Sequence, residues 1–238
     1  MISLARAVAA LVLAAAVAAG CGHARRTASS LRPPPAAASK GARHPVVIAA
    51  LGDSITAGSP LWDPDSAVRN RLGDRLNQQS QYEFWAQRRL GPRVSFRNCG
   101  VYGERTDQIA RRLPGCARSA QALIIQGGIN DIVQGRPVAL AARDLRAMVR
   151  AGKRLGLRVE LVDVLPWNNG YPRADRPIRR LNRRIAAIGR REHVRVLPFY
   201  RTLDDPARPG RMPERLTIDG DHPSPPGYRM LGDLIRLP

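Results

Sequence analysis

Short apolar segments recur along the chain, and longer segments between them carry apolar residues at every third or fourth position. The first apolar run, residues 46–51, is uncharged, consists of small and β-branched residues and ends at Gly52. Such runs are typical of strands buried on both faces of a parallel sheet. We therefore predict five strands, at residues 46–51, 94–96, 122–126, 158–165 and 194–197.

The periodic segments predict helices at residues 81–90, 138–155 and 175–191. Ser80 and Glu83 have the spacing of a capping box for the first helix, and Gly156 is a natural stop for the second. Residues 59–79 show a poor pattern interrupted by two prolines and are predicted to form an excursion beside Ser54. The alternation of strands and helices predicts a single α/β domain, residues 46–238, with a parallel sheet.

The N-terminal segment has the pattern of an export signal. Arg6 precedes an apolar stretch, and small residues lead to Cys21, so residues 1–20 are predicted to be a signal peptide. A cysteine at this point resembles the bacterial lipobox, which implies that Cys21 is lipidated and becomes the first mature residue. Simple secretion and an uncleaved anchor remain the alternatives. The protein is thus expected to be an exported, membrane-anchored lipoprotein of the cell envelope, or otherwise secreted or periplasmic.

Residues 21–45 are rich in Pro, Ala and Arg and contain no acidic residue, so we predict a flexible tether. The formal net charge is +20, of which +14 belongs to residues 46–238, with 33 basic and 19 acidic residues. Such a domain is attracted to anionic surfaces, although a coding bias toward arginine explains the same excess. An export signal and the lack of a nucleic-acid-binding motif argue against nucleic acid as the partner.

Ser54 follows the first predicted strand, at the sheet edge where parallel α/β proteins bind ligands. A serine hydroxyl becomes a nucleophile only with a base, a group that orients the base and donors for an oxyanion. Gly100 follows the second strand and can offer its N–H, and Asn130 follows the third and carries a side-chain amide. Both residue types are also ordinary in turns.

Asp219 and His222 supply the missing base near the C-terminus. An imidazole is suited to moving a proton at neutral pH, and a carboxylate three residues earlier can contact its other nitrogen if the chain turns. Asp53 is a weaker candidate for that carboxylate. A metal site formed by Asp219, Asp221 and His222 is a weak alternative because these residues have no distant fourth partner.

Together these motifs resemble the SGNH hydrolase superfamily, also called GDSL lipases or esterases, whose four signature residues fall on Ser54, Gly100, Asn130 and His222. The resemblance implies a flavodoxin-like sheet of five parallel strands between helices and a serine esterase without a cofactor. In it Ser54 attacks the ester, His222 is the general acid and base, Asp219 orients His222, and Ser54, Gly100 and Asn130 hold the oxyanion. An O-acetyltransferase or a glycan-binding envelope protein of the same fold is the alternative.

The substrate is predicted only as a small-molecule or glycan ester. Trp62, Trp167 and Tyr171 lie in segments expected near Ser54 and are candidates for its binding surface, although packing beneath a loop is an equal alternative. Cys99 and Cys116 can form a disulfide in an exported protein or remain buried thiols. We expect a monomer.

Overall fold

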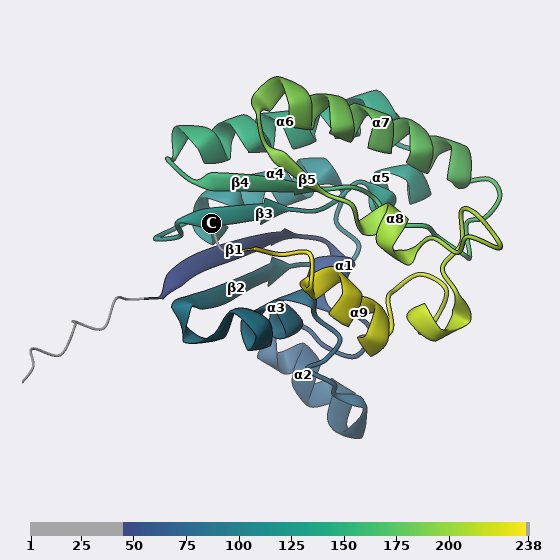
Figure 1. Cartoon of the computed structure of the whole chain (residues 1–238), viewed down its shortest axis with the longest axis horizontal. Coiled ribbons are helices and arrows are strands. Elements are labelled where there is room, and N and C mark those ends of the chain that lie inside the picture. Colours follow the sequence, from purple (N-terminus) through teal and green to yellow (C-terminus); the bar gives the residue numbers. More distant parts are fainter. Residues whose placement is uncertain (1–44, 237–238) are drawn as a thin grey trace, which may run out of the picture. The chain divides into compact units, whose positions relative to one another are not determined.

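The computed structural model describes residues 45–236. Its centre is a sheet of five parallel strands, in the order β2-β1-β3-β4-β5 (Figure 1). The strands are β1 Val46–Gly52, β2 Val94–Gly100, β3 Ala122–Ile125, β4 Arg158–Val162 and β5 Arg195–Leu197. This order confirms the predicted flavodoxin-like α/β fold. All five predicted strands exist, although β2 runs four residues further, to Gly100, and β4 ends three residues earlier, at Val162, than the apolar patterns suggested.

Helices cover both faces of the sheet. They are α1 Ser54–Ala57, α2 Ser66–Leu72, α3 Tyr82–Leu90, α4 Thr106–Cys116, α5 Ile129–Val133, α6 Val138–Arg154, α7 Asp175–Glu192, α8 Phe199–Leu203 and α9 Pro225–Gly232, with short 3-10 helices at Gly73–Arg75, Gly91–Arg93 and Glu214–Leu216.

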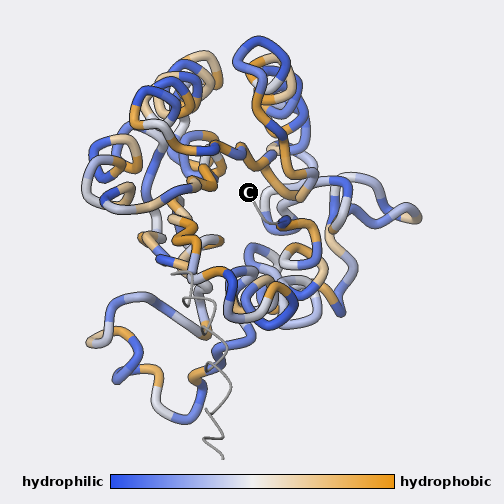
Figure 2. Tube along the Cα trace, turned by 60° about the vertical axis from the view of Figure 1, so that its left-hand side comes forward, coloured by the Kyte–Doolittle hydropathy of each residue, from blue (hydrophilic) through white to orange (hydrophobic). Residues whose placement is uncertain are grey.

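Alternate residues of each strand face two separate cores. In β1, Ala49 and Leu51 pack against the layer of α4, α6 and α7, whereas Ile48 and Ala50 pack against the layer that contains α3 and α9. Figure 2 shows hydrophobic residues along the strands and mixed colours along the helices, as expected where each helix buries only one side. The continuous apolar runs are thus explained by a sheet covered on both faces.

The strand order changes direction at β1, because the chain pairs β2 on one side of β1 and then β3 on the other. In such sheets, ligands bind outside the carboxyl ends of the strands at this switch point. Gly52, Gly100 and Ile125 mark the ends of β1, β2 and β3 there. The segments that follow these strands carry the residues discussed below.

One local prediction was wrong. The capping box before α3 does not form: Gln81 is the N-cap without a side-chain hydrogen bond, while the Ser80 hydroxyl and both Glu83 carboxylate oxygens are buried without partners. Glu83 is enclosed in the core and does not reach back to the helix start, and this burial raises its pKa well above the usual range. The segment at residues 59–79, for which no helix was predicted, contains α2.

The predictions for the two long helices, α6 and α7, agree closely with the structure. Helix α6 ends at Arg154, and Gly156 follows with φ of 75° in the left-handed region. Helix α7 covers the predicted segment and extends to Glu192.

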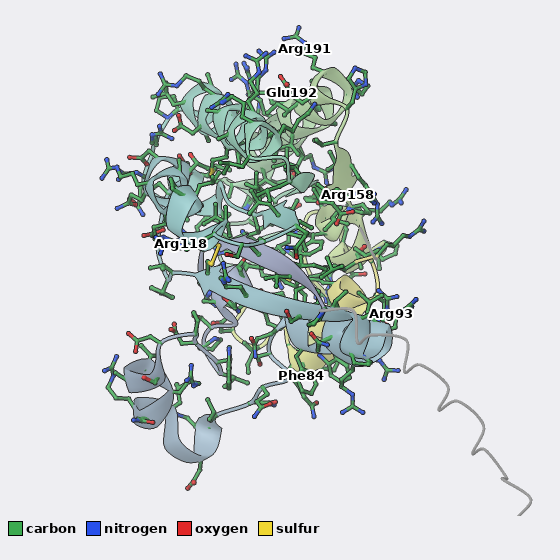
Figure 3. The ribbon with its side chains drawn as sticks, turned by 90° about the vertical axis from the view of Figure 1, so that its left-hand side faces the viewer. Phe84, Arg93, Arg118, Arg158, Arg191 and Glu192 are labelled. Atoms are coloured by element: carbon green, nitrogen blue, oxygen red, sulfur yellow. A yellow bond between two sulfur atoms is a disulfide. The ribbon has the colours of Figure 1, made fainter. Side chains whose placement is uncertain are left out.

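The described residues belong to one compact unit, and the predicted signal peptide, Cys21 and the tether up to residue 44 lie outside them. Among residues 45–236, no helix has the length and apolar character needed to span a membrane. Cys99 and Cys116 are joined by a disulfide, seen as the yellow bond in Figure 3, which answers the question that the sequence left open.

Candidate active site

Ser54 lies at the first turn of α1, directly beyond β1. Asp53 is the N-cap of this helix: its backbone is extended and its Oδ1 accepts a hydrogen bond of 3.0 Å from the Ile55 N–H. Gly52 has no room for a side chain, since an added Cβ would collide with Thr56 and Gln126. The glycine therefore allows the tight passage from strand to helix that presents Ser54 at the sheet edge.

Ser54, His222 and Asp219 form a continuous chain of contacts. The Ser54 Oγ lies 3.0 Å from the His222 Nε2, and the His222 Nδ1 lies 2.7 Å from the Asp219 Oδ2. Both Ser54 and the imidazole are buried, at 6% and 7% exposure. This is the geometry of a nucleophile, its base and the group that orients the base.

Asp219 remains an acceptor for His222. Burial opposes its ionisation, but hydrogen bonds from the side chain and the backbone N–H of His222 outweigh burial and lower the pKa of Asp219 below its usual value. The carboxylate is therefore ionised at neutral pH. It can hold the imidazole with the proton on Nδ1, which leaves Nε2 free to accept the proton of Ser54.

The turn from Asp219 to His222 is held from outside by the loop that follows β4. Trp167 donates its indole N–H to the Asp221 carboxylate, and Asn169 donates to the same carboxylate at 2.7 Å and to the Asp219 carbonyl at 2.8 Å. Asp221 thus has a structural role in this turn. Within residues 45–236 no cluster of three or more potential metal-binding side chains occurs, and the contacts of Asp221 give no support to the metal alternative.

Gly100 does not fit its predicted role as an oxyanion donor. Its N–H already donates to the Asn98 Oδ1 at 2.9 Å, and a Cβ at this position would collide with the Ala57 backbone. The glycine is needed because β2 ends directly against α1. Close packing, and not a free N–H, explains why glycine stands here.

The loop after Gly100 offers a better donor. Asn130, near the start of α5, donates one amide hydrogen to the Glu104 carbonyl at 3.0 Å, which places this loop beside it. Gly103, one residue earlier, has φ of 76°, and its Cβ direction points into open space. Its N–H has no hydrogen-bond acceptor among the described residues. The sequence shows both glycines, but only the structure reveals which N–H is occupied.

Tyr102 was not identified from the sequence. Its ring is stacked on the His222 imidazole, with 6.2 Å between ring centroids and 30° between planes, while 66% of the residue remains exposed. The only sequence signal was an aromatic residue between Gly100 and Gly103, in a loop that follows a strand. An exposed aromatic ring over the imidazole is a candidate contact for substrate.

The three aromatic residues predicted to bind substrate do not form a single cluster. Trp167 and Tyr171 line a pocket of about 480 Å³ that also includes Ile132 and Val133 of α5, the helix that carries Asn130. Trp62 instead packs beneath the guanidinium of Arg69, 4.9 Å from its ring centroid. Trp167 and Tyr171 therefore share a cavity with α5, the helix that carries Asn130. The contact of Trp62 with substrate stays a prediction.

A buried network of polar side chains surrounds the residues next to Ser54. Gln126 accepts hydrogen bonds from the Asp53 N–H and from the Thr56 hydroxyl, and the latter also contacts the Tyr82 hydroxyl. Burial raises the pKa of Asp53 to about 6, and one of its carboxylate oxygens has no partner among the described residues. Asp53 contacts the start of α1, whereas Asp219 is the carboxylate hydrogen-bonded to the His222 ring.

Comparisons with known proteins agree with this geometry. Residues 50–230 match the model of the GDSL-like Lipase/Acylhydrolase family. A comparison with curated protein sequences found no match.

Solved structures share the fold at low sequence identity. A GDSL-like lipase from Bacteroides thetaiotaomicron has a TM-score of 0.62 and 20% identity, over 81% of this chain and 88% of that one. A member of the lipolytic G-D-S-L family from Veillonella parvula has a TM-score of 0.62 and 19% identity, over 79% and 95%. The SGNH-hydrolase family esterase AlinE4 has a TM-score of 0.55 and 21% identity, over 79% and 92%.

Proposed function

Because the chain belongs to the GDSL-like lipase/acylhydrolase family and is a hydrolase acting on esters, we propose that it cleaves carboxylic esters through an acyl-enzyme on Ser54. The observation that carries this mechanism is the unbroken series of contacts from the Ser54 Oγ through both nitrogens of His222 to Asp219. No other serine of the described residues contacts an imidazole.

In the first half of the reaction, the Ser54 Oγ attacks the ester carbonyl carbon and its proton passes to the His222 Nε2. The tetrahedral intermediate then expels the alcohol, which takes this proton from Nε2. In the second half, water loses a proton to the same nitrogen and attacks the acyl group, and the proton returns to Ser54 as the carboxylic acid leaves. Asp219 keeps the ring oriented and stabilises it while it is protonated.

The negative charge on the carbonyl oxygen needs donors fixed in advance. We assign the Ser54 N–H, the second amide hydrogen of Asn130 and, in place of Gly100, the Gly103 N–H. The support is that Asn130 uses only one of its two amide hydrogens on Glu104, while the Gly100 N–H is occupied. Each such donor contributes roughly 3 kcal/mol to lowering the barrier.

Replacing Ser54 with alanine tests the nucleophile. Ser54→Ala is expected to reduce p-nitrophenyl acetate hydrolysis by at least about three orders of magnitude, because the attacking atom is lost. A fluorophosphonate probe should label Ser54 in the unaltered protein only, as seen by peptide mass spectrometry. Ser66→Ala, on the exposed face of α2, is the matched control and should keep full activity. Unchanged hydrolysis by a folded Ser54→Ala protein would exclude this mechanism.

The ester remains defined only by class. Trp167, Tyr171 and the two apolar residues of α5 make the 480 Å³ pocket a suitable place for the acyl or sugar part of a substrate. If a sugar hydroxyl replaces water in the second half, the same intermediate gives acetyl transfer, so product analysis with and without a sugar acceptor separates the two reactions.

The protein is further proposed to be an exported lipoprotein anchored through Cys21. The Cys99–Cys116 disulfide supports export, because disulfides persist in oxidising compartments. When cells produce the protein in the presence of labelled fatty acid, the protein should carry the label. The Cys21→Ser variant should not carry it. Equal labelling of both proteins would contradict lipidation at this residue.

A further inference from the structure

A groove of about 640 Å³ lies between the outer sides of α6 and α7. These two helices lie side by side in one layer over the sheet, and Figure 3 shows Arg191 at the outer surface of this layer. The groove shares no lining residue with Ser54, His222, Asp219 or their loops. It is therefore separate from the candidate active site.

Arginine dominates this groove. Its lining includes Arg143, Arg146, Arg150 and Arg154 from α6 and Arg184 and Arg191 from α7. Glu192, a neighbouring carboxylate, is buried and accepts hydrogen bonds from Arg146 and Arg150. Arg154, Arg184 and Arg191 are exposed and form no salt bridge with a carboxylate in the described part of the chain.

The charges also follow a regular line. The arginines of α6 stand three or four residues apart, so at a helical rise of about 1.5 Å per residue their positions advance roughly 5 Å at a time. The lining between them also includes small residues, Ala139, Ala142, Ala147 and Ala187, which leave room for a chain to approach the helices. A guanidinium binds a carboxylate through two parallel hydrogen bonds.

We propose that the groove between α6 and α7 binds a linear acidic polysaccharide, with its carboxylates paired to the exposed Arg154, Arg184 and Arg191. The concave form of the groove distinguishes this ligand from a membrane, because a flat lipid surface would meet only the arginines on the rims. Binding here would hold an acidic polymer on the enzyme independently of the ester being cleaved.

The experiment measures binding of fluorescently labelled polygalacturonate fragments to the full protein at low and at moderate salt. We expect binding that weakens as salt rises, and no binding of dextran, which is uncharged. Arg154→Ser, Arg184→Ser and Arg191→Ser combined should weaken binding about tenfold, as expected for the loss of three exposed ion pairs. Arg71→Ser, Arg75→Ser and Arg93→Ser combined remove the same charge from exposed positions outside the groove and should change affinity less than twofold.

The results separate this proposal from its competitors and from the esterase mechanism. Equal weakening of polygalacturonate binding in the two triple variants would show a general charge effect and would rule out the groove as the binding site. Failure of the unaltered protein to bind polygalacturonate, or clearly tighter binding to anionic phospholipid vesicles or to single-stranded nucleic acid, would overturn the ligand class. The groove variant should hydrolyse p-nitrophenyl acetate normally and Ser54→Ala should bind the polymer normally, so failure of the esterase mechanism leaves this test intact.

Discussion

Tyr102 places an aromatic ring against the imidazole that we propose as general base. The ring is held by a loop, remains 66% exposed, and stacks on His222 from the solvent side. We expect a ring in this position to limit the movement of the imidazole. It can also contact the group bound to Ser54.

Removing this ring should reduce catalysis measurably. We expect Tyr102→Ala to lower kcat/KM for p-nitrophenyl acetate by roughly threefold to tenfold, since aromatic stacking contributes about 0.5–1.5 kcal/mol. Tyr102→Phe keeps the ring and should keep at least half of the activity. If Tyr102→Phe loses as much activity as Tyr102→Ala, the hydroxyl matters and stacking does not. Steady-state kinetics of the three proteins decides between these outcomes.

At this scale the sequence identifies chemical groups but not which of them are already bonded. Ser54, Asp219 and His222 could be selected because their residue types and the order of their motifs are unusual together. Gly100 was selected for the same reason, yet its N–H is occupied by a side chain only two residues away. Such short contacts depend on the local backbone path, and one loop with two glycines allows several paths.

The disulfide links two elements that frame the site. Cys99, near the end of β2, is joined to Cys116, the last residue of α4, across 17 positions. The enclosed segment contains Tyr102, Gly103 and Glu104, all of which belong to the loop beside His222 and Asn130. The bond therefore ties the base of this loop to the helix that follows it.

Breaking this bond should destabilise the protein. Closing a loop of this length restricts the unfolded chain by about 3 kcal/mol, so Cys99→Ser combined with Cys116→Ser should lower the free energy of unfolding by that amount. Urea unfolding followed by circular dichroism measures the change. A reducing agent should lower the stability of the unaltered protein similarly and leave the double variant unchanged. Equal stability of both proteins under oxidising conditions would show that the bond contributes nothing.

Elements with a strong hydrophobic period could be predicted, whereas those that depend on tertiary contacts could not. The apolar strands and the long helices α6 and α7 follow from their own residues. Helix α4 was not predicted, and its segment contains Pro114 inside the helix, which disfavours a helical reading. Ser80 and Glu83 illustrate the opposite case, in which a local pattern predicted a feature that does not form. The capping box is absent because both side chains are buried in the core.

Across the whole molecule, the basic charge and the buried acids act on different properties. The +14 charge of residues 46–238 governs attraction to other molecules, as in the groove between α6 and α7. Folding stability depends more on carboxylates whose pKa differs between the folded and the unfolded chain. Burial raises the pKa of both Asp53 and Asp163 to about 6, from the value of 3.8 that the free side chain has.

A raised carboxylate pKa means that the folded protein holds a proton which the unfolded chain has already lost. Asp53 therefore costs no stability below about pH 4, costs progressively more as the pH rises toward 6, and has its full cost above that value. Asp53→Asn keeps an N-cap acceptor for Ile55 but cannot ionise. It should raise the free energy of unfolding by about 3 kcal/mol at pH 7.5 and leave it nearly unchanged at pH 4, since each pKa unit corresponds to about 1.4 kcal/mol.

Urea unfolding of the two proteins at both pH values measures this difference, and the comparison cancels the contribution of Asp163 because both proteins retain it. Asp65→Asn is the matched control, since Asp65 is also an N-cap, of α2, but is exposed to solvent. It should change stability little and equally at the two pH values. A gain from Asp53→Asn that is the same at pH 4 and pH 7.5 would mean that the substitution improves packing or capping. The cost of a buried charge beside Ser54 would then be excluded as the cause.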